Sequence, residues 1–116
     1  MSVVTAWTAL PEPRRAVNWR GKSGRHYTLL SDDLDTFQLD DSRLYVLGAG
    51  DVALWVGTAE DVIESCERRT AFKAALKICS SVLRYDEPLD EYERMATAWD
   101  VENGHMAAQL RLVGAD

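Results

Sequence analysis

Residues 43–64 constrain the fold of this chain more than any other part of its sequence. Two short β-prone runs, residues 44–47 and 52–56, flank a loop at 48–51 whose glycines can adopt the positive φ angles of a tight hairpin turn. Both runs are almost continuously apolar, which predicts a hairpin buried on both of its faces. Thr58 then stands where the N-cap of a following helix is expected. The segment therefore predicts a strand–turn–strand–helix unit at the centre of the fold.

Further elements are expected on both sides of the hairpin 43–57. Residue patterns predict strands near residues 26–30 and 81–85, and helices near 59–65, 67–79 and 88–99. Together they make an α+β domain, in which helices cover a small and mostly antiparallel sheet. The last residues, 107–112, fit either a final helical turn or a strand.

Large apolar residues outside the hairpin indicate which surfaces face the core. The helix expected at 67–79 carries apolar residues over a wide arc, so it is predicted to be largely buried. The helix at 88–99 has a narrower stripe that is predicted to face the core. That stripe consists of Leu89, Tyr92, Met95, Ala96 and Trp99. Trp19, Trp55 and Trp99 are all expected as core residues.

The length of 116 residues suits one domain with a modest core. Residues 1–16 contain Pro11 and Pro13 but no clear period, so we expect an irregular N-terminal arm before a single domain at 17–116. No apolar run approaches the roughly 20 residues of a membrane span, and no secretory signal is evident, so a cytoplasmic protein without a membrane partner is expected. Cys66 and Cys79 are expected as reduced, buried thiols.

Charge is distributed in blocks along a chain whose net charge is −6. This net charge disfavours the phosphate backbone of nucleic acids as a partner and favours a basic protein surface. The acidic candidates for binding are Asp32, Asp33, Asp35, Asp40, Asp41, Asp86, Glu87, Asp90, Glu91 and Glu93. A basic segment offers an alternative surface for nucleic acid, formed by Arg14, Arg15, Arg20, Lys22 and Arg25.

Two glycine-containing segments imitate nucleotide-binding motifs without completing them. Residues 21–24 read Gly-Lys-Ser-Gly, but Ala16 stands where the first glycine of a P-loop is needed, so a surface turn is expected. Residues 48–50 begin like a dinucleotide fingerprint, but the third glycine is absent and a strand follows. Neither segment predicts a nucleotide site.

The tripeptides at residues 44–46 and 55–57, followed by a helix beginning at Ala59, resemble the GIY-YIG nuclease domain. The resemblance covers residues 17–100 and implies a small antiparallel sheet with an arginine on the following helix and a metal-binding glutamate on a later one. As a nuclease, the chain would use Mg²⁺ or Mn²⁺. The candidate catalytic residues that the resemblance implies are Tyr45, Trp55, Arg68, Arg69, Glu91 and Glu93.

The chain departs from that family at the positions that carry its chemistry. Leu44 replaces the glycine of the first tripeptide, and Trp55 replaces the first tyrosine of the second. Ser65 falls where the arginine is expected, and a serine cannot supply the charge that stabilises a scissile phosphate. We therefore expect a protein that is not an enzyme, with no catalytic residues, no metal site and no cofactor.

Two specific functions are compatible with these features, and a structural or oligomerising accessory module is a third, general alternative. The first is a non-catalytic acidic protein with a GIY-YIG-like fold that binds a basic protein surface. One form of it is a phage or mobile-element inhibitor, of the anti-CRISPR or anti-restriction type, whose carboxylates mimic DNA in a nucleic-acid-binding complex. The second is a metal-dependent GIY-YIG-type DNA endonuclease or a nucleic-acid-binding module. The sequence indicates no oligomeric state.

Overall fold

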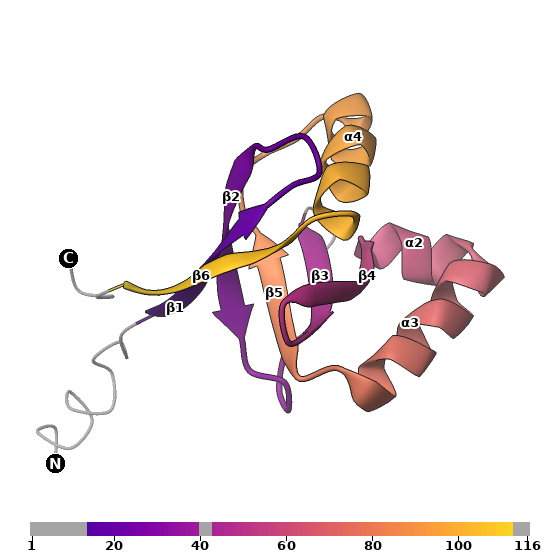
Figure 1. Cartoon of the computed structure of the whole chain (residues 1–116). Coiled ribbons are helices and arrows are strands. Elements are labelled where there is room, and N and C mark those ends of the chain that lie inside the picture. The colour runs from indigo at the N-terminus through magenta and orange to yellow at the C-terminus, as the bar shows by residue number, and fades with distance from the viewer. Residues whose placement is uncertain (1–13, 40–42, 113–116) are drawn as a thin grey trace, which may run out of the picture.

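A computed structural model describes residues 14–39 and 43–112 of the chain. Its strands are β1 (Arg14–Arg20), β2 (His26–Asp32), β3 (Leu44–Ala49), β4 (Val52–Gly57), β5 (Ser81–Tyr85) and β6 (His105–Leu112). Its helices are α2 (Ala59–Glu64), α3 (Cys66–Ile78) and α4 (Glu91–Glu102) (Figure 1). The strands form one 6-stranded sheet in the order β4-β3-β5-β2-β1-β6, and all neighbouring strands are antiparallel. The predicted α+β class is confirmed.

The predicted elements occur within a few residues of their expected positions. The helix expected at 88–99 begins later, at Glu91, because Asp90 provides the N-cap. The Asp90 carboxylate accepts the backbone N–H of Glu93 at 2.7 Å, and the Glu93 carboxylate accepts the N–H of Asp90 at 3.1 Å. This capping box fixes the start of α4 and leaves Pro88 in the preceding loop.

Two strands lie outside the predicted set, β1 and β6, and they pair with each other. β6 decides the alternative left open for residues 107–112 in favour of a strand. The predicted boundary between arm and domain, after residue 16, falls inside β1. Residues 1–13 of the predicted arm lie outside the described residues, as do the acidic candidates Asp40 and Asp41.

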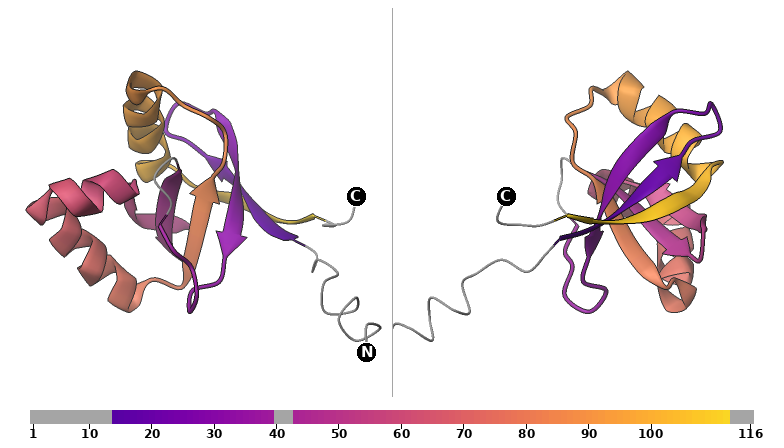
Figure 2. Two further views of the ribbon diagram at one scale, coloured as in Figure 1. Left: turned by 180° about the vertical axis from the view of Figure 1, so that it is seen from behind. Right: turned by 60° about the vertical axis from the view of Figure 1, so that its left-hand side comes forward.

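The sheet consists of two hairpins that β5 joins. β1 and β2 form one hairpin, β3 and β4 form the other, and β5 lies between β2 and β3. The sheet curls strongly (Figure 2). The two edge strands, β4 and β6, approach each other. The backbone N–H of Met106 in β6 donates to the carbonyl oxygen of Asp51, the residue before β4, at 2.8 Å. The curl creates an inner face that α4 covers.

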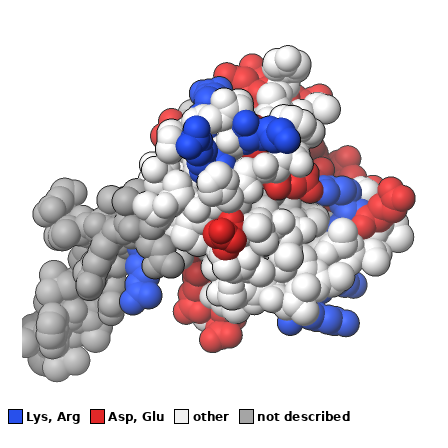
Figure 3. Space-filling view, viewed as in Figure 1, with Lys and Arg blue, Asp and Glu red and all other residues white. Residues whose placement is uncertain are grey.

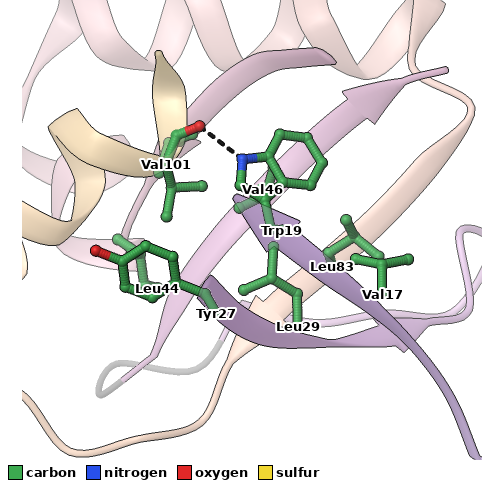
Figure 4. Packing of buried hydrophobic residues seen from close by; sticks show 9 residues of the cluster. Val17, Trp19, Tyr27, Leu29, Leu44, Val46, Leu83 and Val101 are labelled. Atoms are coloured by element: carbon green, nitrogen blue, oxygen red, sulfur yellow. Dashed lines mark hydrogen bonds between the residues drawn. The ribbon is translucent and has the colours of Figure 1, made fainter. Parts of the chain in front are cut away.

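The core under α4 draws residues from nearly every strand. Trp19 of β1, Leu29 of β2, Val46 of β3 and Leu83 of β5 pack there against Val101 of α4 (Figure 4). The Trp19 side chain is completely buried, and its indole N–H donates to the Val101 carbonyl oxygen at 2.8 Å. This bond ties the end of α4 to the first strand.

A second core lies on the opposite face of β3, β4 and β5, under α3. Tyr45 and Leu47 contribute to it, whereas their neighbours in β3, Leu44 and Val46, belong to the first core. Trp55 meets Phe72 of α3 edge to face, with ring centroids 4.9 Å apart. The hairpin is therefore buried on both faces, as its apolar runs predicted.

Several predictions about burial are wrong, because α3 and α4 each cover the sheet with one side only. The buried residues of α3 are Phe72 and Ala75, whereas Ile78 is exposed. Cys66, at the start of the same helix, is exposed and not buried. Trp19 and Trp55 lie in the core as predicted, but Trp99 is 58% exposed.

Candidate functional site

The two aromatic residues that the GIY-YIG resemblance would place in catalysis point into the second core. Tyr45 is 2% exposed, and its hydroxyl donates to the Gln38 carbonyl oxygen at 3.1 Å. Trp55 is equally buried against Phe72, and its indole N–H has no hydrogen-bond partner among the described residues. Apolar side chains therefore fill the face that these two residues share.

The two candidate arginines of α3 are engaged with nearby backbone and ring groups. The Arg68 guanidinium lies 5.0 Å from the centroid of the Trp55 ring and donates to the Val56 carbonyl oxygen. Arg69 donates to the carbonyl oxygens of Val62 and Ile63 at 3.1 and 3.2 Å. These oxygens lie in the last turn of α2, so Arg69 caps that helix.

A pocket of about 300 Å³ between α4 and α2 brings two of the candidate catalytic residues together. Arg68 and Glu91 both line it, whereas Tyr45, Trp55, Arg69 and Glu93 do not. Glu60, Asp61 and Arg94 also line the pocket, and none of the three is among the residues predicted from the sequence. Asp61 lies 3.8 Å from the Arg68 guanidinium. The signal that could have found Glu60 and Asp61 is their position in the first turn of α2.

The described residues do not fit a magnesium or manganese site. Within residues 14–39 and 43–112, no group of three or more His, Cys, Asp or Glu side chains could hold a metal ion. Glu93 is committed to the capping box of α4. The carboxylates of the pocket at Glu60, Asp61 and Glu91 thus give a charged rim without the oxygen cluster that such a cation needs.

The two acidic blocks meet around one arginine. Arg84 of β5 forms an ion pair with Asp32 of β2, and its Nε donates to Asp86 at 2.8 Å. Arg43 reaches the same Asp86 oxygen at 2.6 Å. Partial burial by itself raises the pKa of Asp86, but the hydrogen bonds from Arg43 and Arg84 outweigh it and lower that pKa below its ordinary value.

This charge network sorts the acidic candidates into two kinds. Asp32 and Asp86 are held by arginines, so their charges are largely balanced within the protein. The other described candidates have exposed side chains, namely Asp33, Asp35, Glu87, Asp90, Glu91 and Glu93. A pocket of about 400 Å³, lined by Asp32, Asp33, Arg43 and Arg84 among others, adjoins the network. Of the exposed candidates, Asp33 lines this pocket, whereas Glu87 and Glu91 line other pockets.

The basic candidates lie mainly around the turn between β1 and β2. Arg15, Arg20, Lys22 and Arg25 are exposed, and of Arg14 the structure describes only the backbone in β1. Figure 3 shows basic side chains beside acidic ones in the upper part of the molecule, where α4 and this turn lie. The charged surface there is mixed, not uniformly basic.

A buried aspartate that is not among the predicted site residues holds this turn in place. Asp100 of α4 is 6% exposed, and it accepts hydrogen bonds from the Ser23 backbone, the Ser23 hydroxyl and the Tyr27 hydroxyl, each at 2.7 Å. Gly21 leaves the room that the carboxylate needs, since a Cβ there would overlap with it. The Gly-Lys-Ser-Gly segment is thus a turn, as expected, and it docks on α4.

Burial and these hydrogen bonds act on the two titrating groups in different ways. Burial alone raises the pKa of Asp100, but the bonds from Ser23 and Tyr27 lower it below its ordinary value. Burial together with the bond to Asp100 raises the pKa of Tyr27 to about 12. Asp100 is therefore the ionised acceptor and Tyr27 the neutral donor over the whole physiological range.

Replacing Asp100 with Asn is expected to lower the free energy of unfolding at pH 7 by about 1–3 kcal/mol, because three donors lose a charged acceptor. Since the pKa of Asp100 is lowered on folding, its contribution is present above its unfolded pKa of about 3.9 and is lost as the pH falls through the folded value. Urea unfolding between pH 7 and pH 3 should show a smaller loss for Asp100→Asn than for the wild type. Glu102→Gln, at an exposed site of α4, is the control, and an equal effect of both substitutions would contradict the role of Asp100.

No family model, curated protein or solved structure matches this chain. The GIY-YIG resemblance therefore stays a prediction. Among the described helices, none has the length and apolar character that crossing a membrane requires.

Proposed function

We propose that this chain is a non-catalytic binding protein whose exposed carboxylates engage a basic protein surface. The observation that carries the proposal is the meeting of the two acidic blocks around Arg84. Arg84 and Arg43 balance Asp32 and Asp86, while Asp33, Asp35 and Glu87 stay exposed beside them. A cluster of exposed like charges attracts and orients a partner of opposite charge.

The class of partner that fits best is a nucleic-acid-binding protein, since its basic channel is built to receive phosphates. Exposed carboxylates in the loops that follow β2 and β5 can occupy such a channel in place of DNA. An inhibitor of a Cas or restriction nuclease would work in this way. The packing of Tyr45, Trp55 and Arg69 favours this role over catalysis, because all three serve the interior or cap a helix.

Displacement of a fluorescent DNA duplex from a panel of Cas and restriction nucleases tests the proposal. The wild-type chain is expected to release the duplex from a member of the panel, with weaker release at higher salt because the contacts are ionic. Asp33→Asn combined with Glu87→Gln should weaken release about tenfold, since exposed ion pairs contribute up to about 1 kcal/mol each. Glu64→Gln combined with Glu67→Gln removes the same charge from exposed sites in α2 and α3 and serves as the control. No release by the wild type, or equal effects of the two double variants, would overturn the proposal.

Binding or cleavage of nucleic acid is the second candidate, because Arg68 and Glu91 line the same pocket. Incubation with linear and branched DNA in Mg²⁺ or Mn²⁺ tests it. Cleavage that Arg68→Ala and Glu91→Gln both abolish would support it. Intact DNA, together with no gel shift at low salt, would remove it.

A further inference from the structure

Helix α4 presents its largest apolar residues to solvent. The predicted core stripe is reversed at Tyr92, Met95 and Trp99, which are 80, 69 and 58% exposed. The helix packs on the sheet through Thr97, Ala98 and Val101 instead.

Two contacts fix the rotation of α4 about its axis. The Asp100 carboxylate has to face Ser23 and Tyr27, and the Val101 carbonyl oxygen has to meet the Trp19 indole. Both contacts lie on the sheet side of the helix. Because one residue of an α-helix turns it by about 100°, these contacts direct Trp99 away from the sheet.

The outward residues form one continuous face. Tyr92, Met95, Ala96 and Trp99 are spaced at i, i+3, i+4 and i+7, the spacing of a single side of a helix. Tyr, Trp and Met are enriched in the centres of protein interfaces, and an exposed apolar patch of this kind marks an interaction site. We refer to these four residues as the α4 face.

Acidic side chains flank the α4 face on both sides. By helical spacing, Glu91 lies beside Met95 and Glu102 beside Trp99 on one border, and Glu93 lies on the opposite border. The pocket of about 300 Å³ adjoins Met95, and Glu60 and Glu91 there form no ion pair with another described residue. Arg68 and Arg94 line the pocket as well, and Arg68 pairs with Asp61 at 3.8 Å, so Glu60 and Glu91 are the carboxylates there that suit the cationic end of a lysine or arginine.

The positive charges near the α4 face are fewer. Arg94 is half-buried and donates to the Leu89 carbonyl oxygen at 3.4 Å. Arg25 lines a pocket with Trp99 at the other end of the face, 5.7 Å from the centroid of the Tyr27 ring. The borders are thus mainly acidic. A second copy of the chain would bring acidic borders together, which disfavours self-association through this face.

We propose that the α4 face docks a basic amphipathic helix of another protein, whose apolar side covers Tyr92, Met95 and Trp99 and whose cations meet Glu60, Glu91 and Glu93. This assignment rests on the proposed function, and it specifies the partner as a cationic helix. An amphipathic helix laid on an apolar face with charged borders is a recurring mode of recognition.

Titration with a synthetic amphipathic peptide of leucine and lysine, 18 residues long, tests the proposal; a peptide of the same composition in scrambled order is the control. Calorimetry is expected to show binding of the amphipathic peptide at least tenfold tighter than of the scrambled one. Trp99→Ala and Met95→Glu should each weaken it at least tenfold, whereas Ile78→Ala, at a 70% exposed site of α3, should leave it unchanged. Thermal unfolding of each variant establishes that it is folded.

Equal binding of the two peptides, or equal effects of Trp99→Ala and Ile78→Ala, would overturn the proposal. A wild-type dimer in sedimentation that Trp99→Ala dissociates would overturn it in favour of a second copy. The DNA-displacement assay separates it from the proposed function. If the wild type releases DNA and Trp99→Ala releases it equally well, the α4 proposal fails while the proposed function stands. If the wild type releases no DNA, the proposed function fails, whatever the peptide does.

Discussion

Replacing Trp19 with Ala is expected to lower the free energy of unfolding by about 3–5 kcal/mol, the range for truncating a buried aromatic side chain. Trp19 is 0% exposed, contacts the centre of the core under α4 and donates its indole N–H to Val101. The substitution removes this packing and leaves the Val101 carbonyl oxygen of α4 without its indole donor. Urea unfolding followed by circular dichroism measures the loss.

Trp99→Ala is the matched control, because it removes the same side chain from a site that is 58% exposed. Its effect on stability is expected to stay within about 0.5 kcal/mol, as for most surface substitutions. Equal losses for Trp19→Ala and Trp99→Ala would contradict the orientation of α4. The pair therefore tests the fold and the exposure of the α4 face in one experiment.

Gly104→Ala is expected to destabilise the protein by about 3 kcal/mol, at the upper end for overpacking, through a clash and not through backbone strain. Gly104 connects α4 to β6, and a Cβ there would overlap with the Arg20 carbonyl oxygen and lie 2.8 Å from the Gly21 Cα. These neighbours are backbone atoms, so they cannot move aside as a flexible side chain would. Thermal or urea unfolding gives the magnitude.

Gly50→Asn provides the comparison for this prediction. Gly50 has a φ of +62° in the β3–β4 turn, and a Cβ there would meet nothing within 4 Å. Asn tolerates that backbone region, so a loss of about 1 kcal/mol or less is expected. If Gly104→Ala lowers the free energy of unfolding no more than Gly50→Asn does, the close contact between Gly104 and the Arg20 backbone is contradicted.

The elements that could be predicted from the sequence are those whose pattern is local. The β3–β4 hairpin consists of two continuously apolar strands on either side of a glycine-containing turn. Thr58 and Asp61 form the capping box that starts α2. β1 is absent from the predicted set because it begins with two arginines, and its pairing with β6 joins opposite ends of the described chain. Such a strand has no local signature that distinguishes it from an arm.

The orientation of α4 could not be predicted for a related reason. Its apolar residues have helical spacing, which identifies a face but not the side on which that face lies. The side is decided by Asp100, whose partners Ser23 and Tyr27 lie 77 and 73 residues away in the sequence. A buried, hydrogen-bonded carboxylate can thus override the preference of larger apolar residues for the core.

The candidate surfaces show the same limit. The acidic blocks are evident from composition, but the sequence does not reveal which of their charges are balanced. Arg84 reaches Asp32 across 52 positions of the chain, and such long-range contacts separate balanced from available carboxylates. Asp86 lies two residues from Arg84, yet its second partner, Arg43, comes from the residue before β3.

The position of β5 between the two hairpins has a consequence for synthesis on the ribosome. Both hairpins emerge before β5, and an isolated two-stranded hairpin is marginally stable in water. A nascent chain that ends before Ser81 therefore exposes unpaired strand edges of both hairpins, which is the state most open to aggregation or capture by chaperones. β1 gains its second neighbour only when β6, the last described strand, has been made, so the sheet is completed at the end of translation of this domain.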